Sequence, residues 1–426
     1  MSTSSRRTFL ALSATAGLGL ASGTLRAAPS EQIRVGIVGV RGRGNSLIRN
    51  FAAQKDVVIA YLCDIDEKAL AGRAAELEKI SGSKVATVKD YRKILDDKDV
   101  DAVVLGTPDH WHALQTIHAC QAGKDVYTEK PDGHNINEGK AMVAASRKHQ
   151  RMVQMGTQLR SAPFLRDAAK FVQSGAIGKV LFGKAWETAK QAPIPRVPDG
   201  EPPAGVDYDL WLGPAPKRPF NRYRFHGNWR WFFDYGSGDL GNDGVHRMDY
   251  CRLVMGLDDF PQSVVAVGGK YFFDDAQEWP DTYQVTYEYP GKILTYEMRI
   301  WSQARMYNQG EGAAVYGETG WVLVNNSSWK AWDGDGKLLL EGGDSKADAL
   351  HTRNFLDAVK SRKREELNQE IASGHVASVM CHAGNISWRT GKRLRFDPKT
   401  ETFDDADANK YLGRENRAGF ELPKVE

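Results

Sequence analysis

The region from residue 31 to residue 155 alternates short apolar, β-branched runs with segments of helical character. The apolar runs predict strands at 33–40, 57–62, 85–89, 102–105, 126–128 and 152–155. The segments between them predict helices at 45–54, 67–80, 113–122 and 137–149. Such alternation with short loops indicates a parallel sheet with helices on both faces. Ligands bind such sheets at the carboxyl ends of the strands, so the residues that follow each strand are the first candidates for a site.

A glycine-rich turn follows the first predicted strand. Its residues are Gly39, Val40, Arg41, Gly42, Arg43 and Gly44. A turn of this kind between a strand and a helix is typical of a dinucleotide-binding loop, with an ordinary structural turn as the alternative. The glycines let a pyrophosphate approach backbone N–H groups at a helix N-terminus. Arg41 occupies the position of the usual second glycine, so the loop can take another path that places Arg41 or Arg43 against a phosphate.

The choice of dinucleotide depends on Asp64, which stands twenty positions after Gly44 at the end of the second predicted strand. A carboxylate at this place accepts hydrogen bonds from the adenosine ribose hydroxyls. Its charge also repels the 2′-phosphate of NADP. The sequence therefore favours NAD over NADP.

Two further strand ends carry candidate residues for the same site. Thr107-Pro108 follows the fourth strand, and Glu129-Lys130-Pro131 follows the fifth. The run from His110 to His112 comes directly after the fourth strand. Its two histidines do not indicate a metal site, because residues two apart on a helix face apart and no further ligands are evident. Trp111 is expected to shape a substrate pocket, with a plain helix start capped by Asp109 as the alternative.

The second half of the chain reads as strands followed by helices. Strands are predicted at 179–187, 264–267, 283–289, 293–300, 314–316, 321–324 and 338–340, and helices at 164–172, 348–361 and 376–388. Residues 192–235 form a long segment rich in proline, tryptophan and arginine, and such segments are usually functional or wrap the body of the protein. Its aromatic faces suit the C–H faces of sugars and Arg230 suits hydroxyls, which favours a carbohydrate or cyclitol. Packing of the segment onto the sheet is the alternative for any single aromatic residue.

Together these motifs resemble the Gfo/Idh/MocA oxidoreductase family, named for glucose–fructose oxidoreductase and inositol dehydrogenase. The resemblance covers nearly all of residues 31–426. It rests on the glycine loop, Thr107-Pro108 with His112, Glu129-Lys130-Pro131 and the run 238–246. It implies an α/β Rossmann domain over residues 31–155, which binds NAD. It also implies an α+β domain over residues 156–426 with an open, largely antiparallel sheet, a C-terminal segment that packs back on the body, and a homo-oligomer, either a dimer or a tetramer.

The resemblance also implies catalytic roles. Lys130 would lie near the nicotinamide and the reacting hydroxyl, and His246 would lie opposite and handle the proton. A histidine suits this task because its ordinary pKa is about 6.5, and a lysine stabilises an alkoxide electrostatically. Family members usually carry an aspartate four residues before this histidine, where this chain has Asn242. An amide only hydrogen-bonds, so an acid role would move to Asp243 or Asp249, and Asp249 could also fix the His246 tautomer.

These inferences give two sets of expected contacts. The cofactor is expected to contact Gly39, Arg41, Gly42, Arg43, Gly44, Asp64, Thr107, Pro108, His112, Glu129 and Lys130. The substrate is expected to contact Trp111, Arg230, Asp243 and His246. No metal is expected.

The first thirty residues read as a targeting signal. A twin-arginine pair, Arg6-Arg7, precedes an apolar run that ends near Ala21, and Ala27-Ala28 follow. This pattern predicts a twin-arginine export signal over residues 1–30 and a periplasmic mature protein, with a short N-terminal helix or a retained anchor as the alternative. No later stretch reaches membrane-spanning length without charges, so no membrane contact is expected after signal removal.

Composition excludes several other classes. The chain has 57 basic and 54 acidic side chains, a net charge of +3, and no basic run typical of a nucleic-acid binder. Its four cysteines, Cys63, Cys120, Cys251 and Cys381, have neither disulfide-scaffold nor zinc spacing and are expected to be buried thiols.

The sequence therefore predicts an exported NAD(P)-dependent oxidoreductase that acts on a hydroxyl of a sugar, glycoside or cyclitol. Because the periplasm has no obvious pool of free NAD, the cofactor is expected to stay tightly bound. One alternative is a redox-neutral glycosidase, which oxidises a sugar hydroxyl, eliminates the aglycone, adds water and returns the hydride. Another is a catalytically inactive sugar-binding protein, which Asn242 favours.

Overall fold

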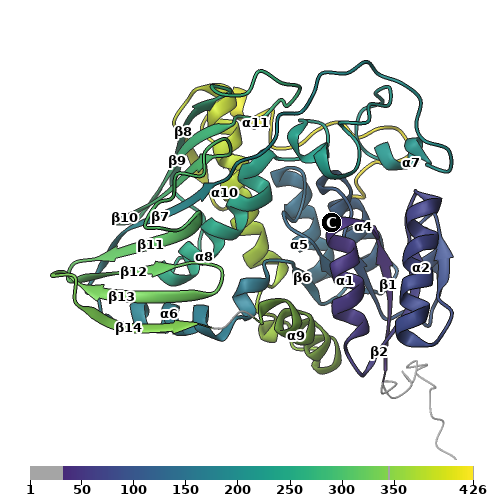
Figure 1. The fold of residues 1–426 in the computed structure, drawn as a ribbon, viewed down its shortest axis with the longest axis horizontal. Helices are drawn as coiled ribbons and strands as arrows, with labels where there is room; N and C mark the ends of the chain where they lie inside the picture. Colours follow the sequence, from purple (N-terminus) through teal and green to yellow (C-terminus); the bar gives the residue numbers. More distant parts are fainter. Residues whose placement is uncertain (1–31, 344–345, 426) are drawn as a thin grey trace, which may run out of the picture. The chain divides into compact units, whose positions relative to one another are not determined.

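The computed structural model describes residues 32–343 and 346–425, so the predicted export signal lies outside the described residues. The first sheet has six parallel strands in the order β3-β2-β1-β4-β5-β6 (Figure 1). They are β1 (Ile33–Val38), β2 (Val57–Cys63), β3 (Ala86–Val88), β4 (Ala102–Leu105), β5 (Asp125–Thr128) and β6 (Val153–Met155). The predicted parallel sheet is thus confirmed. Its strand order reverses between β1 and β4, where open α/β sheets bind ligands.

Five helices belong to this sheet. They are α1 (Gly42–Ala52), α2 (Glu67–Ser81), α3 (Arg92–Asp96), α4 (Asp109–Gln121) and α5 (Ile136–Lys148). Helix α1 begins three residues earlier than predicted, because Gly42 and Gly44 form its first turn instead of preceding it. Gly39 turns the chain into the helix with a φ of +82°. A Cβ on Gly44 would lie 1.8 Å from the Gly39 carbonyl oxygen, so this crossing admits only glycine.

The second sheet has ten strands in the order β14-β13-β12-β11-β7-β10-β9-β8-β15-β16. They are β7 (Val180–Thr188), β8 (Ser263–Gly269), β9 (Thr282–Tyr289), β10 (Lys292–Arg299), β11 (Glu311–Gly317), β12 (Gly320–Val324), β13 (Ser328–Asp333), β14 (Leu338–Gly343), β15 (Leu394–Asp397) and β16 (Thr402–Phe403). Every pairing is antiparallel except that of β7 with β10. One face packs against α6 (Pro163–Gln173), α8 (Val245–Met255) and α10 (Ile371–Thr390) (Figure 1). The expected α+β region with a largely antiparallel sheet is therefore confirmed.

Residues after the second sheet complete the core of the first. Helix α9 (Ala347–Ser361) packs against the Rossmann sheet and α1, where the ring of Phe355 lies 5.8 Å from that of Tyr127 in β5 and 6.3 Å from that of Phe51 in α1. Beyond the short helix α11 (Ala406–Asn409), Phe420 places its ring 5.6 Å from that of Trp111. The N-terminal core is thus built partly by residues more than 300 positions downstream.

Residues 189–235, here called the strap, connect β7 to the run that carries the predicted histidine. The strap includes helix α7 (Tyr208–Leu212) and a 3₁₀ turn, η2 (His226–Trp231). It crosses the end of β2, where the Asp207 N–H donates to the Ile65 carbonyl at 3.0 Å and the Glu67 N–H donates to the Gly205 carbonyl at 3.1 Å. Figure 1 shows this segment running above α4 and α2. The strap therefore lies over the edge of the sheet at which a ligand would bind.

All four cysteines are buried and unbridged, as predicted. Within residues 32–343 and 346–425, no helix is long and apolar enough to cross a membrane. Over the same ranges, no three His, Cys, Asp or Glu side chains gather as metal ligands would.

Candidate functional site

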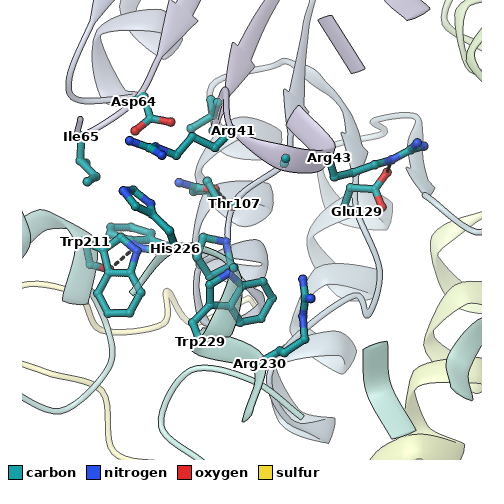
Figure 2. A pocket seen from close by; sticks show the side chains of 18 of the residues that line it. Arg41, Arg43, Asp64, Ile65, Thr107, Glu129, Trp211, His226, Trp229 and Arg230 are labelled. Atoms are coloured by element: carbon teal, nitrogen blue, oxygen red, sulfur yellow. Dashed lines mark hydrogen bonds and ion pairs between the residues drawn. The ribbon is translucent and has the colours of Figure 1, made fainter. Parts of the chain in front are cut away.

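A cavity of about 410 Å³ lies at the carboxyl ends of β1, β2, β4 and β5 (Figure 2). The strap forms one wall with α7 and η2, and a π-helical turn, η3 (Leu240–Gly244), forms another together with the start of α8. The predicted site residues that line it are Gly39, Arg41, Gly42, Arg43, Asp64, Thr107, Pro108, Trp111, Glu129, Lys130, Arg230, Asn242, Asp243 and His246. Gly44 and His112 do not line it. The structure thus gathers nearly all the predicted residues around one space.

The glycine loop has the geometry of a phosphate cradle. Arg41 precedes α1 without a side-chain cap, so the first N–H groups of the helix are not satisfied by that side chain. A Cβ on Gly42 would meet no atom within 4 Å, so the backbone there borders open space. A helix N-terminus with uncapped N–H groups beside open space fits the pyrophosphate of a dinucleotide.

Asp64 joins the second strand to the glycine loop. Its Oδ2 accepts from the Val40 N–H at 2.9 Å and its Oδ1 accepts from the Asp66 N–H at 3.0 Å. Burial raises the pKa of Asp64, whereas these backbone hydrogen bonds and Arg41 oppose the rise. The carboxylate borders the cavity, where an adenosine ribose would meet it.

Arg41, Asp66 and His226 form a polar cluster, here called the latch, that ties the strap to the Rossmann sheet. Arg41 pairs with Asp66, and His226 Nε2 lies 3.3 Å from Asp66 Oδ2. Asp66 also caps α2 by accepting from the Ala69 N–H at 3.1 Å. Figure 2 shows Arg41 beside Asp64 with His226 facing it. Asp66 and His226 were not predicted, since only the capping position of Asp66 before a helix is visible in the sequence.

The second arginine of the loop points elsewhere. Arg43 Nε donates to Glu129 Oε1 at 2.9 Å, and its guanidinium also pairs with Asp348 of α9. Glu129 accepts a further hydrogen bond from Gln158 Nε2 at 3.0 Å. Figure 2 shows the Arg43–Glu129 pair apart from Arg41. Of the two arginines, Arg41 is therefore the one beside the Asp64 carboxylate.

The residues after β4 connect the loops and the strap that surround the cavity. His112 places Nδ1 2.7 Å from the Pro131 carbonyl and Nε2 2.8 Å from the Thr107 carbonyl, so it joins the two loops without reaching the cavity. Asp109 does not cap the helix: it is the first residue of α4, and it accepts from Ser237 Oγ at 2.9 Å. Trp111 lines the cavity and donates from Nε1 to the Trp211 carbonyl of the strap at 2.9 Å.

Lys130 and Asn242 form the centre of the polar wall. Lys130 Nζ donates to the Asn242 carbonyl at 2.6 Å and to its Oδ1 at 3.0 Å, and Asn242 Nδ2 donates to Asp243 Oδ2 at 3.0 Å. Burial lowers the pKa of Lys130, and the nearby Arg230 adds to this, whereas Asp243 opposes it. The amide therefore orients both Lys130 and Asp243 without adding a charge.

His246 lies in the first turn of α8 and borders the same cavity. Burial lowers its pKa well below 6.5, and the charges of Lys130 and Arg247 lower it further. The imidazole is therefore neutral at pH 7, as a general base must be. The expected tautomer-fixing role of Asp249 is wrong, because Asp249 binds Arg160 through two hydrogen bonds of 2.9 and 2.8 Å and also contacts Arg252.

Arg230 is the unpaired cation of the cavity. Its guanidinium carbon lies 5.4 Å from the centre of the Trp229 ring, and among the described residues no hydrogen bond or ion pair holds it. It borders the same space as Lys130 and His246. Its donors are thus available to a bound molecule.

The fold and this cavity together define a Rossmann-type dinucleotide-binding oxidoreductase. Comparison with protein families agrees: residues 33–157 match the oxidoreductase family's NAD-binding Rossmann fold, and residues 182–422 match its C-terminal alpha/beta domain. The chain belongs to the GFO/IDH/MocA oxidoreductase family, as the sequence motifs indicated, and NAD is its cofactor.

Curated relatives match part of the chain. A glycosyl hydrolase family 109 protein of Saccharopolyspora erythraea is 32% identical over 206 residues, which cover 42% of this chain and 44% of the relative. A levoglucosan dehydrogenase of Pseudarthrobacter phenanthrenivorans is 36% identical over 183 residues, 43% of this chain and 40% of the relative. The chain therefore spans less than half the length of these relatives.

Solved structures share the fold over most of the chain. A levoglucosan dehydrogenase in complex with NADH and levoglucosan superposes with a TM-score of 0.67 at 19% identity, covering 85% of this chain and 99% of that one. An aldose-aldose oxidoreductase from Caulobacter crescentus gives 0.66 at 19% identity, covering 86% and 100%. At these identities the likeness supports the fold alone.

Proposed function

We propose that this chain is an exported, NAD-dependent oxidoreductase that removes a hydride from a secondary hydroxyl of a sugar, glycoside or cyclitol. The observation that carries the proposal is the meeting of Lys130, neutral His246 and unpaired Arg230 in the cavity that also holds Asp64 and the glycine loop. The levoglucosan dehydrogenases among its relatives support a carbohydrate substrate.

The residues divide the chemistry as follows. The glycine loop and Asp64 would hold NAD, which would supply the acceptor for the hydride of the carbon that carries the hydroxyl. His246 takes the hydroxyl proton, and the Lys130 ammonium holds the oxygen as its negative charge develops. Asn242 positions Lys130 through the two hydrogen bonds at 2.6 and 3.0 Å. Arg230, Asp243 and Trp111 hold the remaining hydroxyls and the sugar face.

The strap supports a cofactor that stays bound between turnovers. It covers the cavity with its own helix α7 and turn η2, and the latch fastens it beside Asp64. Retention of the cofactor suits an exported protein, because the periplasm has no obvious pool of free NAD. The retained cofactor must then be regenerated by a second substrate or by a redox-neutral cycle. Asp64 supports NAD in preference to NADP.

A redox-neutral glycosidase is the second candidate, favoured by the relatives named as glycosyl hydrolase family 109 proteins. Oxidation of a sugar at C3 acidifies the proton on C2. The base His246 could then remove that proton and expel the aglycone, before water adds and the hydride returns. Net NADH formation during turnover would support the dehydrogenase, and turnover without it would support the cycle. Tight sugar binding without any hydride transfer would support an inactive binding protein.

We also propose that the chain forms a homo-oligomer, a dimer or a tetramer, through the open face of the second sheet. Directly paired residues on six neighbouring strands form an apolar row on this face: Ile293, Phe182, Tyr316, Trp321, Trp332 and Leu338. Ile293 and Leu338 are 37% and 45% exposed. Light scattering of the purified protein measures the number of subunits.

The proposed function is tested by purifying the exported protein, denaturing it and identifying the dinucleotide that it releases. Near-stoichiometric NAD would support the retained cofactor and the role of Asp64. A protein that is empty and binds no added dinucleotide would refute the proposal in favour of the inactive binder. An empty protein that readily takes up NAD would support a conventional dehydrogenase and oppose export with a bound cofactor.

A further inference from the structure

A second cavity, of about 250 Å³, lies apart from the site described above. Its wall includes His134, Phe233, Trp279, His382, Arg389 and Tyr411. It shares no lining residue with the first cavity. The two cavities are nevertheless neighbours along the chain, because Lys130 and Arg230 border the first whereas His134 and Phe233 border the second.

Arg389 is held in this wall by aromatic rings. Its guanidinium carbon lies 4.0 Å from the centre of the Phe233 ring, 4.8 Å from that of Trp279 and 5.2 Å from that of Tyr411. Among the described residues, no carboxylate or carbonyl accepts a hydrogen bond from it. Stacking on aromatic faces fixes the plane of the guanidinium and leaves its N–H edge free to bind an anion.

The acidic side chains near Arg389 are already engaged. Asp234, which lines the cavity, pairs with Arg218 at 2.7 Å. Glu278 accepts from the Phe233 N–H at 2.6 Å and lies 3.5 Å from Arg218. Arg414, the other arginine of the wall, pairs with Glu138 at 3.2 Å, so among the described lining residues Arg389 is the arginine without a carboxylate partner.

Two histidines supply hydrogen-bond acceptors. His134 Nε2 lies 2.8 Å from the Phe233 carbonyl and His382 Nε2 lies 3.0 Å from the Gly133 carbonyl, so both Nε2 atoms carry the proton. Each Nδ1 is then an acceptor, and within the described part of the chain neither has a donor; that of His134 is completely buried. Burial lowers the pKa of His134 well below 6.5 and that of His382 to about 4, so both rings are neutral at pH 7.

We infer that this cavity binds a small hydroxy acid. The carboxylate of the ligand would accept hydrogen bonds from the free N–H groups of Arg389, and its hydroxyl groups would donate to the Nδ1 atoms of His134 and His382. The aromatic rings of Trp279 and Tyr411 would lie against the C–H groups. A sulfate ion has no hydrogen to donate to the histidines, and a neutral sugar has no charge for the arginine. The ligand must therefore carry both groups.

Titration calorimetry of the full chain with gluconate tests this inference. We expect one gluconate per chain, with glucose and sulfate binding at least tenfold more weakly. Arg389→Gln should weaken the binding of gluconate at least tenfold and leave the dinucleotide content unchanged. Arg393→Gln is the matched control, because Arg393 pairs with Glu288 outside this cavity. Its replacement should leave the affinity for gluconate unchanged.

Three results would overturn the inference. The first is the absence of gluconate binding to the unaltered chain, and the second is sulfate that binds as tightly as gluconate. The third is gluconate binding that survives Arg389→Gln but is lost in Lys130→Met, which would assign it to the first cavity. If Arg389→Gln fails to fold, Tyr411→Ser removes one wall at a residue that is 40% exposed, and an unchanged affinity there would also count against the inference.

Discussion

Replacing Asp66 by Asn tests whether the strap retains the cofactor. The substitution keeps an N-cap of equal quality for α2 and removes the negative charge that holds Arg41 and His226. The Arg41 side chain is 46% exposed, so solvent screening limits the interaction free energy of the Arg41–Asp66 ion pair to at most about 1 kcal/mol. Burial lowers the pKa of His226 to about 4, so its ring is neutral at pH 7 and its 3.3 Å contact with Asp66 is worth at most roughly 1 kcal/mol.

Together these losses amount to at most about 2 kcal/mol. If the latch must open before the dinucleotide leaves, Asp66→Asn should speed release by up to about 25-fold, since 1.4 kcal/mol corresponds to a factor of ten. The assay follows the fluorescence of bound NADH after mixing with an excess of NAD. Glu76→Gln is the matched control, because Glu76 of α2 also contacts two basic side chains, Arg49 of α1 and Arg73 of α2, but lies away from the cavity. Release at an unchanged rate in Asp66→Asn, with the strap still folded, would refute the role of the latch.

Four other predictions address the remaining parts of the structure. Lys130→Met should slow reduction of bound NAD at least 100-fold in single-turnover absorbance, with dinucleotide content unchanged. Asp64→Ala should weaken NAD binding and narrow its advantage over NADP in calorimetry. Asp249→Asn should lower the free energy of unfolding, measured in urea, by about 3–5 kcal/mol, because it breaks a buried ion pair. A shifted pH profile of activity without this loss of stability would instead support a role of Asp249 in fixing the tautomer of His246. The carboxylates of Asp132 and Glu401 raise the pKa of His375 to about 9, so the stabilisation of the fold by this histidine is complete below pH 6.5 and is lost as the pH rises through 9. His375→Gln should flatten this part of the plot of the free energy of unfolding against pH.

The sequence predicts those features that depend on neighbours along the chain. Strand and helix alternation, the glycine loop and the residues after each strand are local, and the structure brings them to one edge of the sheet. The start of α1 is misjudged, because whether Gly42 belongs to a turn or to a helix depends on how closely the loop crosses Gly39. The latch is missed for a similar reason, since His226 reaches Asp66 across 160 positions of sequence.

Asp249 shows where spacing alone misleads. Its position three residues after His246 suggests contact on one helix face. A buried carboxylate, however, is stabilised most by the cation that binds it through two hydrogen bonds. That cation is Arg160, which lies 89 positions upstream in a 3₁₀ turn, η1 (Gln158–Ser161), and no local pattern reveals it.

Asn242 deserves a different interpretation once its contacts are known. From the sequence, an amide in place of the family's aspartate favours an inactive protein. In the structure its oxygen accepts from Lys130 and its nitrogen donates to Asp243, so one neutral side chain fixes both charged neighbours. A carboxylate at this position would face Asp243 with a like charge and lose that second hydrogen bond. The amide thus holds Lys130 and Asp243 in one wall of the cavity without adding a charge, and the substitution is no argument against the catalytic roles proposed for Lys130 and His246.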